Sequence, residues 1–386
     1  MTLDHRSAIA YHPDFLGYDF GPQHPLRPER ITAGLGLLRA SGLWSAEDET
    51  LSPPVASDQD LELVHDPAFI ATVKSAGTDW LPDEKLRRFG LSSTDNPAFP
   101  GMHHAAALVT GGSVAAVREI MRGELAHAFN PAGGLHHAMH SRASGFCIYN
   151  DPAVAAAVAL KEFGARVLYV DFDCHHGDGV QWLFYGEPQV LTISFHESGR
   201  FLFPGTGDVD EIGEGAGRGY SVNIPMAPFT QDDSWLQAIH AVVPPLTELF
   251  GPDLIISSHG ADTHRWDPLT HLALTTAAFV AQASLVHALA HRHAEGKWLA
   301  VGSGGYDWRR VVPRSWSIVW AEMAGRQLPE LLPESWRAEW HGDPLEPIPT
   351  AFLDAPEMGE PTGNADEITR ANQQTVRAVL RLAGLN

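Results

Sequence analysis

Short runs of apolar residues, each followed by glycine and polar residues, recur along the chain. We expect these runs to form buried strands, because they have the length and the β-branched or aromatic content of strands. Four of them are "ARVLYVDF" (165–172), "QVLTISFH" (189–196), "DLIISSHG" (253–260) and "KWLAVGSGG" (297–305). A fifth candidate is "LAHAFN" (125–130).

Helical patterns lie between or beside these runs, at residues 101–123, 151–164, 232–243 and 275–293. In the second of them, Asp151 is expected as the N-cap and Pro152 as the first helical residue. The alternation predicts an α/β fold, in which a mostly parallel central sheet carries helices on both faces. In such sheets, ligands bind beyond the carboxyl ends of the strands.

The composition changes near residue 327. Residues 1–326 are predicted to form one domain, and residues 327–386 begin with a stretch rich in Pro and Glu. The end of this stretch predicts an amphipathic helix over 365–383, with an apolar stripe formed by Ile368, Val376, Val379 and Leu380. We expect the segment to be an extension packed on the same domain rather than a second domain.

The composition is that of a globular protein, with 44% hydrophobic and 19% charged residues among 386. A membrane span is not expected, because no apolar run approaches 18 residues. The N-terminus lacks the basic-then-apolar pattern of a secretion signal. The two cysteines, Cys147 and Cys174, are too few for a disulfide framework, so a cytoplasmic protein is expected.

The net charge is −21, from 26 basic and 47 acidic residues. Such a field disfavours nucleic acid and favours cationic partners, such as lysine-rich peptides or polyamines. Acidity that serves only solubility is the commoner explanation of this charge.

Polar clusters follow four of the candidate strands. They are "GGLHHAMH", "DCHHGDG", "HGAD" and "GSGGYD". Because the carboxyl ends of parallel strands meet at one edge of a sheet, we expect the four clusters to converge there.

Asp173, His175 and Asp262 offer two carboxylates and one imidazole. Three protein ligands with an open position are typical of a catalytic zinc rather than a structural one. The set contains no thiolate, so Fe(II), Co(II) and Mn(II) fit it as well. An Asp-x-His pair alone is more often a turn or a helix cap; the second acid after another strand favours a metal site.

His136 and His137 are candidates for proton transfer, with Asp171 and Asp178 available to fix their tautomers. An isolated His-His pair is more often structural. Tyr306 follows two glycines and is a candidate donor to an oxyanion. Together these residues predict metal-assisted hydrolysis of an amide or a related carbonyl bond.

The motifs resemble those of the histone deacetylase superfamily, which includes bacterial acetoin-utilisation proteins. The resemblance spans about residues 5–325, and its motifs, in the family's order, are 129–151, 171–181, 201–208, 259–269 and 302–307. The stretch "LSSTDNPAFPGMHHAAALVTGG" (91–112) is especially similar to the acetoin-utilisation branch. The resemblance implies a zinc-dependent deacetylase with an arginase-like fold.

The resemblance also implies roles for individual residues. His137 would be the general base and acid, His136 mainly an electrostatic partner, and Tyr306 the group that polarises the acyl carbonyl. Arg30 resembles the arginine of an internal channel for acetate; the alternative is a cation on a helix surface. The implied substrate-binding residues are Asp95, Gly145, Phe146, Phe203, Leu269 and Gly304. Among them, Asp95 would lie at the rim, and Phe146, Phe203 and Leu269 would form the walls of a tunnel.

Two potassium sites are implied in the same way. The inner one would use Asp171, Asp173, His175, Ser194 and Phe195. The second one would use Phe184, Glu187, Val190 and Tyr220.

Two departures from the family pattern stand out. Where many relatives have four glycines before the tyrosine, this chain has Gly302-Ser303-Gly304-Gly305, and the side chain of Ser303 either restricts the site or points away. Beside Asp262 stand His264, Arg265 and Trp266, where eukaryotic relatives are smaller and less basic. A preference for histones is therefore not carried over.

The leading hypothesis is a zinc-dependent deacetylase of lysine side chains in proteins; the resemblance suggests an acyl-CoA synthetase as one such protein. An acylpolyamine deacetylase is the alternative, although residues 65–95 hold no long insertion to narrow the entrance. A protein that binds acyl-lysine without catalysis would be expected to lack Tyr306 or a histidine, and this chain has both.

Overall fold

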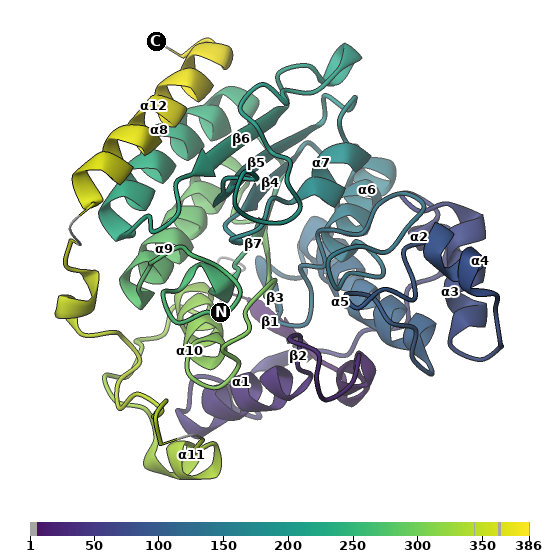
Figure 1. The fold of residues 1–386 in the computed structure, drawn as a ribbon, viewed down its shortest axis with the longest axis horizontal. Helices are drawn as coiled ribbons and strands as arrows, with labels where there is room; N and C mark the ends of the chain where they lie inside the picture. Colours follow the sequence, from purple (N-terminus) through teal and green to yellow (C-terminus); the bar gives the residue numbers. More distant parts are fainter. Residues whose placement is uncertain (1–5, 343, 362–363, 386) are drawn as a thin grey trace.

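Eight strands of the described residues form one sheet in the order β2-β1-β3-β8-β7-β4-β5-β6 (Figure 1). This computed structural model describes residues 6–342, 344–361 and 364–385. The strands are β1 (Ser7–Ala10), β2 (Glu49–Leu51), β3 (His127–Asn130), β4 (Val167–Asp171), β5 (Val190–Glu197), β6 (Ser221–Met226), β7 (Leu254–Ser258) and β8 (Trp298–Val301). All neighbours pair in parallel, which confirms the predicted α/β class.

Helices cover both faces of the sheet (Figure 1). On one face lie α5 (Met102–Met121) and α6 (Asp151–Phe163), which pack against each other. On the other face lie α1 (Glu29–Ala40), α8 (Asp232–Phe250), α9 (Thr276–His293) and α10 (Val312–Met323). Every residue of β4, β5, β7 and β8 is buried, which explains why apolar residues predominate in β4, β7 and β8, whereas β5 alternates apolar residues with buried Thr192, Ser194 and His196.

Shorter elements complete the chain. The remaining helices are α2 (Asp58–Leu61), α3 (Pro67–Ala76), α4 (Asp83–Arg88), α7 (Asp178–Leu183), α11 (Glu334–Glu339) and α12 (Ala365–Leu382). The 3₁₀ turns are η2 (Pro13–Gly17), η3 (Gly215–Gly217), η4 (Ala261–Thr263) and η5 (Pro356–Gly359).

The predicted strand at 297–305 was too long, because β8 ends at Val301 and the glycines beyond it form a loop. The helix predicted over 232–243 was too short. It continues as α8 to Phe250 through Pro244 and Pro245, and buries further apolar side chains beyond them.

The start of α6 corrects another prediction, since Asn150 rather than Asp151 is the N-cap. The side chain of Asn150 accepts a hydrogen bond from the backbone N–H of Ala153 (3.1 Å). Asp151 is fully buried, and its carboxylate accepts the N–H groups of Gly134 and Leu135 at 2.9 and 2.8 Å. The acid therefore holds a neighbouring loop instead of capping its own helix.

The C-terminal extension packs on the same body. Trp336 of α11 donates its indole N–H to the carbonyl of Ala33 in α1 (2.9 Å). The predicted terminal helix is present as α12 and lies along α8 and β6, shown in yellow in Figure 1. Its buried residues are Val379, which was predicted to face inward, and Asn372, which was not.

Candidate metal centre and active site

Four loops meet at the carboxyl edge of the sheet, where they follow the adjacent strands β3, β8, β7 and β4. The register aligns the strand ends: Asp171 of β4 pairs with Ser258 of β7, and Val301 of β8 pairs with both Ser258 and Asn130 of β3. The polar clusters that follow these strands therefore converge, as the sequence predicted.

Asp173, His175 and Asp262 lie around one point. One ligand atom from each lies within 4.8 Å of the others, and all three residues are buried. The Nδ1 atom of His175 lies 3.0 Å from Asp173 Oδ1 and 3.0 Å from Asp262 Oδ2. The sequence-predicted ligands are thus brought together from the loop after β4 and from η4.

The charge of this cluster fits a divalent cation. Burial, together with the negative charge of Asp173, raises the pKa of Asp262 to about 6. Two buried carboxylates side by side are unfavourable unless a positive charge lies between them. Two acids and one imidazole match an open, catalytic metal site, and the donor set accommodates Zn(II), Fe(II), Co(II) or Mn(II).

Backbone approaches the carboxylates so closely that only glycine fits at two positions. The N–H of Gly304 donates to Asp173 Oδ2 at 2.8 Å, and a Cβ atom on Gly304 would collide with Asp262 Oδ2. A Cβ atom on Gly260 would lie 2.6 Å from Asp173 Oδ2. The absence of side chains there leaves room for the two acids to face each other.

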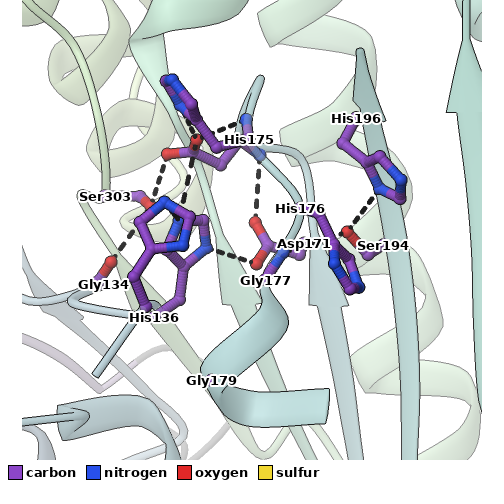
Figure 2. Close-up of polar contacts among 12 residues, drawn as sticks. Gly134, His136, Asp171, His175, His176, Gly177, Gly179, Ser194, His196 and Ser303 are labelled. Atoms are coloured by element: carbon purple, nitrogen blue, oxygen red, sulfur yellow. Dashed lines mark hydrogen bonds and ion pairs between the residues drawn. The ribbon is translucent and has the colours of Figure 1, made fainter. Parts of the chain in front are cut away.

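Two aspartate–histidine pairs stand beside the cluster, and Figure 2 shows the first of them, His136 with Asp171. His136 Nδ1 donates to Asp171 Oδ2 at 2.7 Å, and His137 Nδ1 donates to Asp178 Oδ1 at 2.6 Å. The two Nε2 atoms lie 3.1 Å apart, and His136 Nε2 is 3.8 Å from Asp173 Oδ1. Each carboxylate fixes one tautomer, with the Nε2 side turned toward the metal cluster.

The two histidines differ in protonation. Burial disfavours the charged form of His136, but Asp171 and Asp173 outweigh it and raise its pKa to about 9. Burial and the charge of His136 lower the pKa of His137 to about 4. At neutral pH, His136 is therefore cationic and His137 is neutral, so that Nε2 of His137 carries a lone pair.

Tyr306 lies next to the cluster, against His175. Its ring meets the rings of His175 and Phe146 edge-on, with centroids 6.3 and 5.7 Å apart. Burial and the charge of Asp262 raise the pKa of its hydroxyl, which therefore keeps its proton at neutral pH. Its backbone N–H donates to Asp267 Oδ2 at 2.8 Å.

Ser303 points into the site rather than away from it (Figure 2). Its backbone has φ 55°, a left-handed conformation that a non-glycine residue rarely adopts. The buried hydroxyl lies 2.8 Å from Asp173 Oδ2, to which it donates, and 3.2 Å from the carbonyl oxygen of Gly134. The serine that departs from the family's glycines is therefore a direct partner of a metal ligand.

Arg30 lies in the interior, so the alternative of a surface cation on a helix is wrong. Its guanidinium donates to the carbonyl of Ser303 at 2.7 Å and lies 5.6 Å from the ring centroid of Trp316. Together with His136, His137 and Tyr306, it lines an inner pocket beside the metal cluster.

An outer pocket opens beside the inner one. It is lined by exposed Asp95, by His24 and by Phe146, and Phe146 lines the inner pocket as well. Phe146 itself has φ 67° and follows Gly145 with φ 52°, so a tight left-handed turn brings its ring to the junction. Strained backbone of this kind is concentrated at functional sites.

The other predicted tunnel residues differ in position. Phe203 is 43% exposed and its ring centroid lies 5.0 Å from that of His137, but it is not among the described residues that line either pocket. A Cβ atom on Gly145 would lie 2.9 Å from Phe203 Cε1 and would collide with His137. Leu269 is half-buried, and the described residues that line the two pockets do not include it.

The residues predicted for potassium lie in two groups. In the first, Asp171 pairs with Ser194 across β4 and β5, next to the metal ligands and to Phe195. In the second, backbone hydrogen bonds connect Phe184, Glu187 and Val190 in succession, and the carbonyl of Tyr220 accepts the N–H of Thr192. Both potassium sites stay predictions.

Sequence reasoning missed three residues of the site. Tyr169 donates its hydroxyl to Asp171 Oδ2 at 2.6 Å, Asp267 holds the backbone of Tyr306, and His24 lies in the outer pocket. Tyr169 stands in an apolar strand and His24 in a Pro-rich loop, so neither position carries a signal in the sequence. Asp267 follows the "HGAD" motif closely and could have been found there.

None of the helices in the described part of the chain combines the length and the apolar character that crossing a bilayer requires.

Comparisons with known proteins agree with this geometry. A sequence model of the histone deacetylase domain matches residues 24–323. The acetoin utilization protein AcuC of Bacillus subtilis (strain 168) is 44% identical over 374 residues, covering 97% of this chain and 96% of that protein. The protein of the same name from Staphylococcus xylosus is 36% identical over 380 residues and covers 98% of both chains.

Solved structures give the same result. A histone deacetylase homolog from Aquifex aeolicus superposes with a TM-score of 0.84 at 30% identity, covering 95% of this chain and 100% of that one. A homolog solved in complex with SAHA gives 0.85 at 30% identity, with 96% and 100% covered. The chain therefore belongs to the histone deacetylase superfamily, in its acetoin-utilisation branch, and is a hydrolase of the deacetylase class with the arginase-like fold of that superfamily.

Proposed function

We propose that this protein is a metal-dependent deacetylase that hydrolyses the acetyl amide of lysine side chains in proteins. The observation that carries the proposal is the placement of a neutral His137, held by Asp178, beside a buried Asp-His-Asp cluster. The pair of His136 with Asp171, the close backbone at Gly304 and the side chain of Tyr306 lie around the same cluster.

Asp173, His175 and Asp262 would hold the metal ion, for which Zn(II) is the first candidate and Fe(II) the second. When bound, a divalent ion supplies Lewis acidity, which polarises an acyl oxygen and makes water a stronger nucleophile. Potassium ions at the two predicted sites belong to the same proposal.

His137 would move the proton. Its Nδ1–H is committed to Asp178, so Nε2 is the atom that accepts a proton from water and returns it to the leaving amine. His136 is held cationic by Asp171 and stabilises negative charge at the reacting centre. Tyr306 keeps its proton and would donate a hydrogen bond to the acyl oxygen as that oxygen becomes negative.

The pockets suit a lysine side chain. Phe146, at the junction of the inner and outer pockets, offers an apolar wall for methylenes. Asp95, exposed in the outer pocket, offers an acceptor for a peptide N–H group or a cation. The net charge of −21 favours the approach of lysine-rich peptides.

The test is turnover of acetyl-lysine peptides by protein loaded with Zn(II) or Fe(II), with metal content measured in parallel. We expect turnover to disappear with the metal and to return on reconstitution. Replacing Tyr306 with Phe should leave the metal content unchanged and lower turnover by about 10²–10³-fold. The control is Tyr185→Phe, because Tyr185 packs on Trp182, outside the residues that line either pocket. Turnover that survives complete removal of the metal would contradict the mechanism.

The charge also suits a small cationic substrate, so acetylspermidine belongs in the same panel. Faster turnover of acetylspermidine than of every acetylated peptide would favour an acylpolyamine deacetylase with the same chemistry. Peptides from an acyl-CoA synthetase test the partner that the acetoin-utilisation branch suggests.

A further inference from the structure

A second cluster of histidines lies at the opposite edge of the sheet. His127 is the first residue of β3, so it stands at the amino end of the strand whose carboxyl end leads to the active site. His287 and His291 lie one helical turn apart near the C-terminal end of α9. A strand and a helix thus bring three imidazoles together, far along the chain from Asp173, His175 and Asp262.

The three rings face one another closely. One nitrogen from each lies within 4.8 Å of the others. The ring centroids are 4.9 Å apart for His127 and His287, 5.1 Å for His127 and His291, and 4.8 Å for His287 and His291. The Nε2 atoms of His287 and His291 are 3.1 Å apart. Two nitrogens bound to one tetrahedral zinc ion at about 2.05 Å would lie about 3.3 Å apart, so only a small movement of these two rings is needed.

A carboxylate stands behind one of the imidazoles. His287 Nδ1 donates to Glu322 Oε1 of α10 at 2.9 Å, and Ser284 donates to the other oxygen of Glu322 at 2.9 Å. This contact fixes the tautomer of His287 with its Nε2 atom toward the cluster. A carboxylate on the far nitrogen is the usual support of a histidine that binds a metal.

The chain closes over the cluster with a glycine. Gly296 has φ 82°, and a Cβ atom there would lie 3.3 Å from His291 Nδ1 and 3.8 Å from His127 Cε1. The three side chains also form a path from the interior to solvent, because His127 is fully buried, His287 is 17% exposed and His291 is exposed. A metal ion can therefore enter from the side of His291.

We propose that His127, His287 and His291 form a second metal site, separate from the active site, for a divalent transition-metal ion such as Zn²⁺, Co²⁺, Ni²⁺ or Cu²⁺. Three neutral imidazoles select these ions over Ca²⁺ and Mg²⁺, which prefer oxygen ligands. The bound ion connects the end of α9 to the start of β3 and, through Glu322, to α10. It stabilises the amino edge of the sheet and takes no part in hydrolysis.

The experiment counts metal ions per chain in untagged protein. Metal-free protein is loaded with excess Zn²⁺ at pH 7.5, freed of loosely bound ions by buffer exchange and analysed for zinc. We expect two equivalents in the unaltered chain and one in the His287→Gln/His291→Gln variant. The matched control is His293→Gln, which removes another histidine from the last turn of α9, outside the cluster, and should keep two equivalents.

Two further measurements separate metal binding from folding. Without metal, the double variant and the unaltered chain should show the same circular dichroism, whereas Zn²⁺ should raise the Tm of the unaltered chain more than that of the variant. If the double variant does not fold, the single variant His291→Gln replaces it, because His291 is exposed. In Co²⁺-loaded Asp262→Ala protein, visible d–d absorption should persist, and it should vanish when His287→Gln and His291→Gln are added.

Two results would overturn the proposal: zinc content that does not differ between the double variant and the control, or a cobalt spectrum that survives the loss of both histidines. In either case the contacts among the three rings would be packing contacts only. Loss of deacetylase activity plays no part in the test, and failure of the proposed function would leave the difference in zinc content between the double variant and the control unaffected.

Discussion

Replacing Ser303 tests whether this departure from the family's glycines supports the metal centre. The hydroxyl donates to Asp173 Oδ2 at 2.8 Å, and the residue holds a left-handed φ of 55°. Ser303→Ala removes the hydroxyl and keeps the unfavourable backbone, whereas Ser303→Gly removes both. The pair of variants therefore separates the hydrogen bond from the conformational strain.

The expected changes in stability follow from the lost hydrogen bond and from the backbone strain. A hydrogen bond to a charged group contributes about 1.5–3 kcal/mol, so we expect Ser303→Ala to lower the free energy of unfolding of the metal-free protein by about that amount. Glycine avoids the left-handed penalty of about 1–2 kcal/mol but loses more conformational freedom on folding, so Ser303→Gly should be about 1 kcal/mol less destabilising than Ser303→Ala. Loss of a group that orients a metal ligand typically weakens metal affinity by about 10–100-fold, and this loss should be similar in both variants.

Zinc affinity is measured by competition with a chromophoric chelator, and stability by urea unfolding of the metal-free chains. Ser257→Ala is the control: this buried hydroxyl accepts a hydrogen bond from the indole of Trp298, away from the three ligands. It should change stability and leave zinc affinity unchanged. If Ser303→Ala binds zinc within twofold of the unaltered chain, the hydroxyl does not support the metal centre and our interpretation of this contact is wrong.

Three further predictions concern Gly145, Asp262 and His65. Gly145→Ala should lower turnover by about 100-fold with metal content unchanged, because the new Cβ atom would displace His137. The control is Gly164→Ala, at φ 66° with open space around it. Equal turnover in the two variants would exclude a displacement of His137. Asp262→Ala should remove the metal of the active site, which full occupancy of that site by elemental analysis would contradict. Burial lowers the pKa of His65 to about 4, below its unfolded value of about 6.5. As the pH falls, the unfolded chain therefore takes up the proton first. The stability that neutral His65 contributes is complete above about pH 6.5 and falls by about 2 kcal/mol by pH 5. Urea unfolding at pH 7 and pH 5 should therefore show a smaller acid loss in His65→Gln, and equal losses would refute the assignment.

The strands that could be predicted are those in which every residue is buried. β4, β7 and β8 are buried along their whole length, so the apolar runs at their start are plain in the sequence. β6 was missed because it is an edge strand that contains Pro225, and because its buried Ser221 and Asn223 are polar residues that bind the side chain of Gln181. Polar partners from other segments cannot be read from a local pattern.

The residues of the site also differ in whether a local pattern can predict them. The Asp-His-Asp cluster and the aspartate–histidine pairs could be predicted because their residue types are costly to bury for any other reason and follow strands that end at one edge. The direction of the Ser303 side chain depends on a left-handed φ, and the inward orientation of Arg30 depends on how α1 packs; neither is a property of the local sequence.

The start of α6 explains how His136 and His137, the two candidate catalytic histidines, are held in place. Asn150 caps the helix with its side-chain oxygen and donates from its side-chain nitrogen to the carbonyls of His136 and Ala138, both at 3.0 Å. Asp151 accepts two N–H groups of the residues just before His136, and the N–H of Asn150 donates to His65 Nε2 at 3.0 Å. Asn150 and Asp151, which the sequence marks only as a helix start, therefore also hold the backbone on both sides of the histidine pair. Because the orientations of His136 and His137 depend on the hydrogen bonds to Asp171 and Asp178, loss of these backbone contacts should lower turnover even where the chain stays folded.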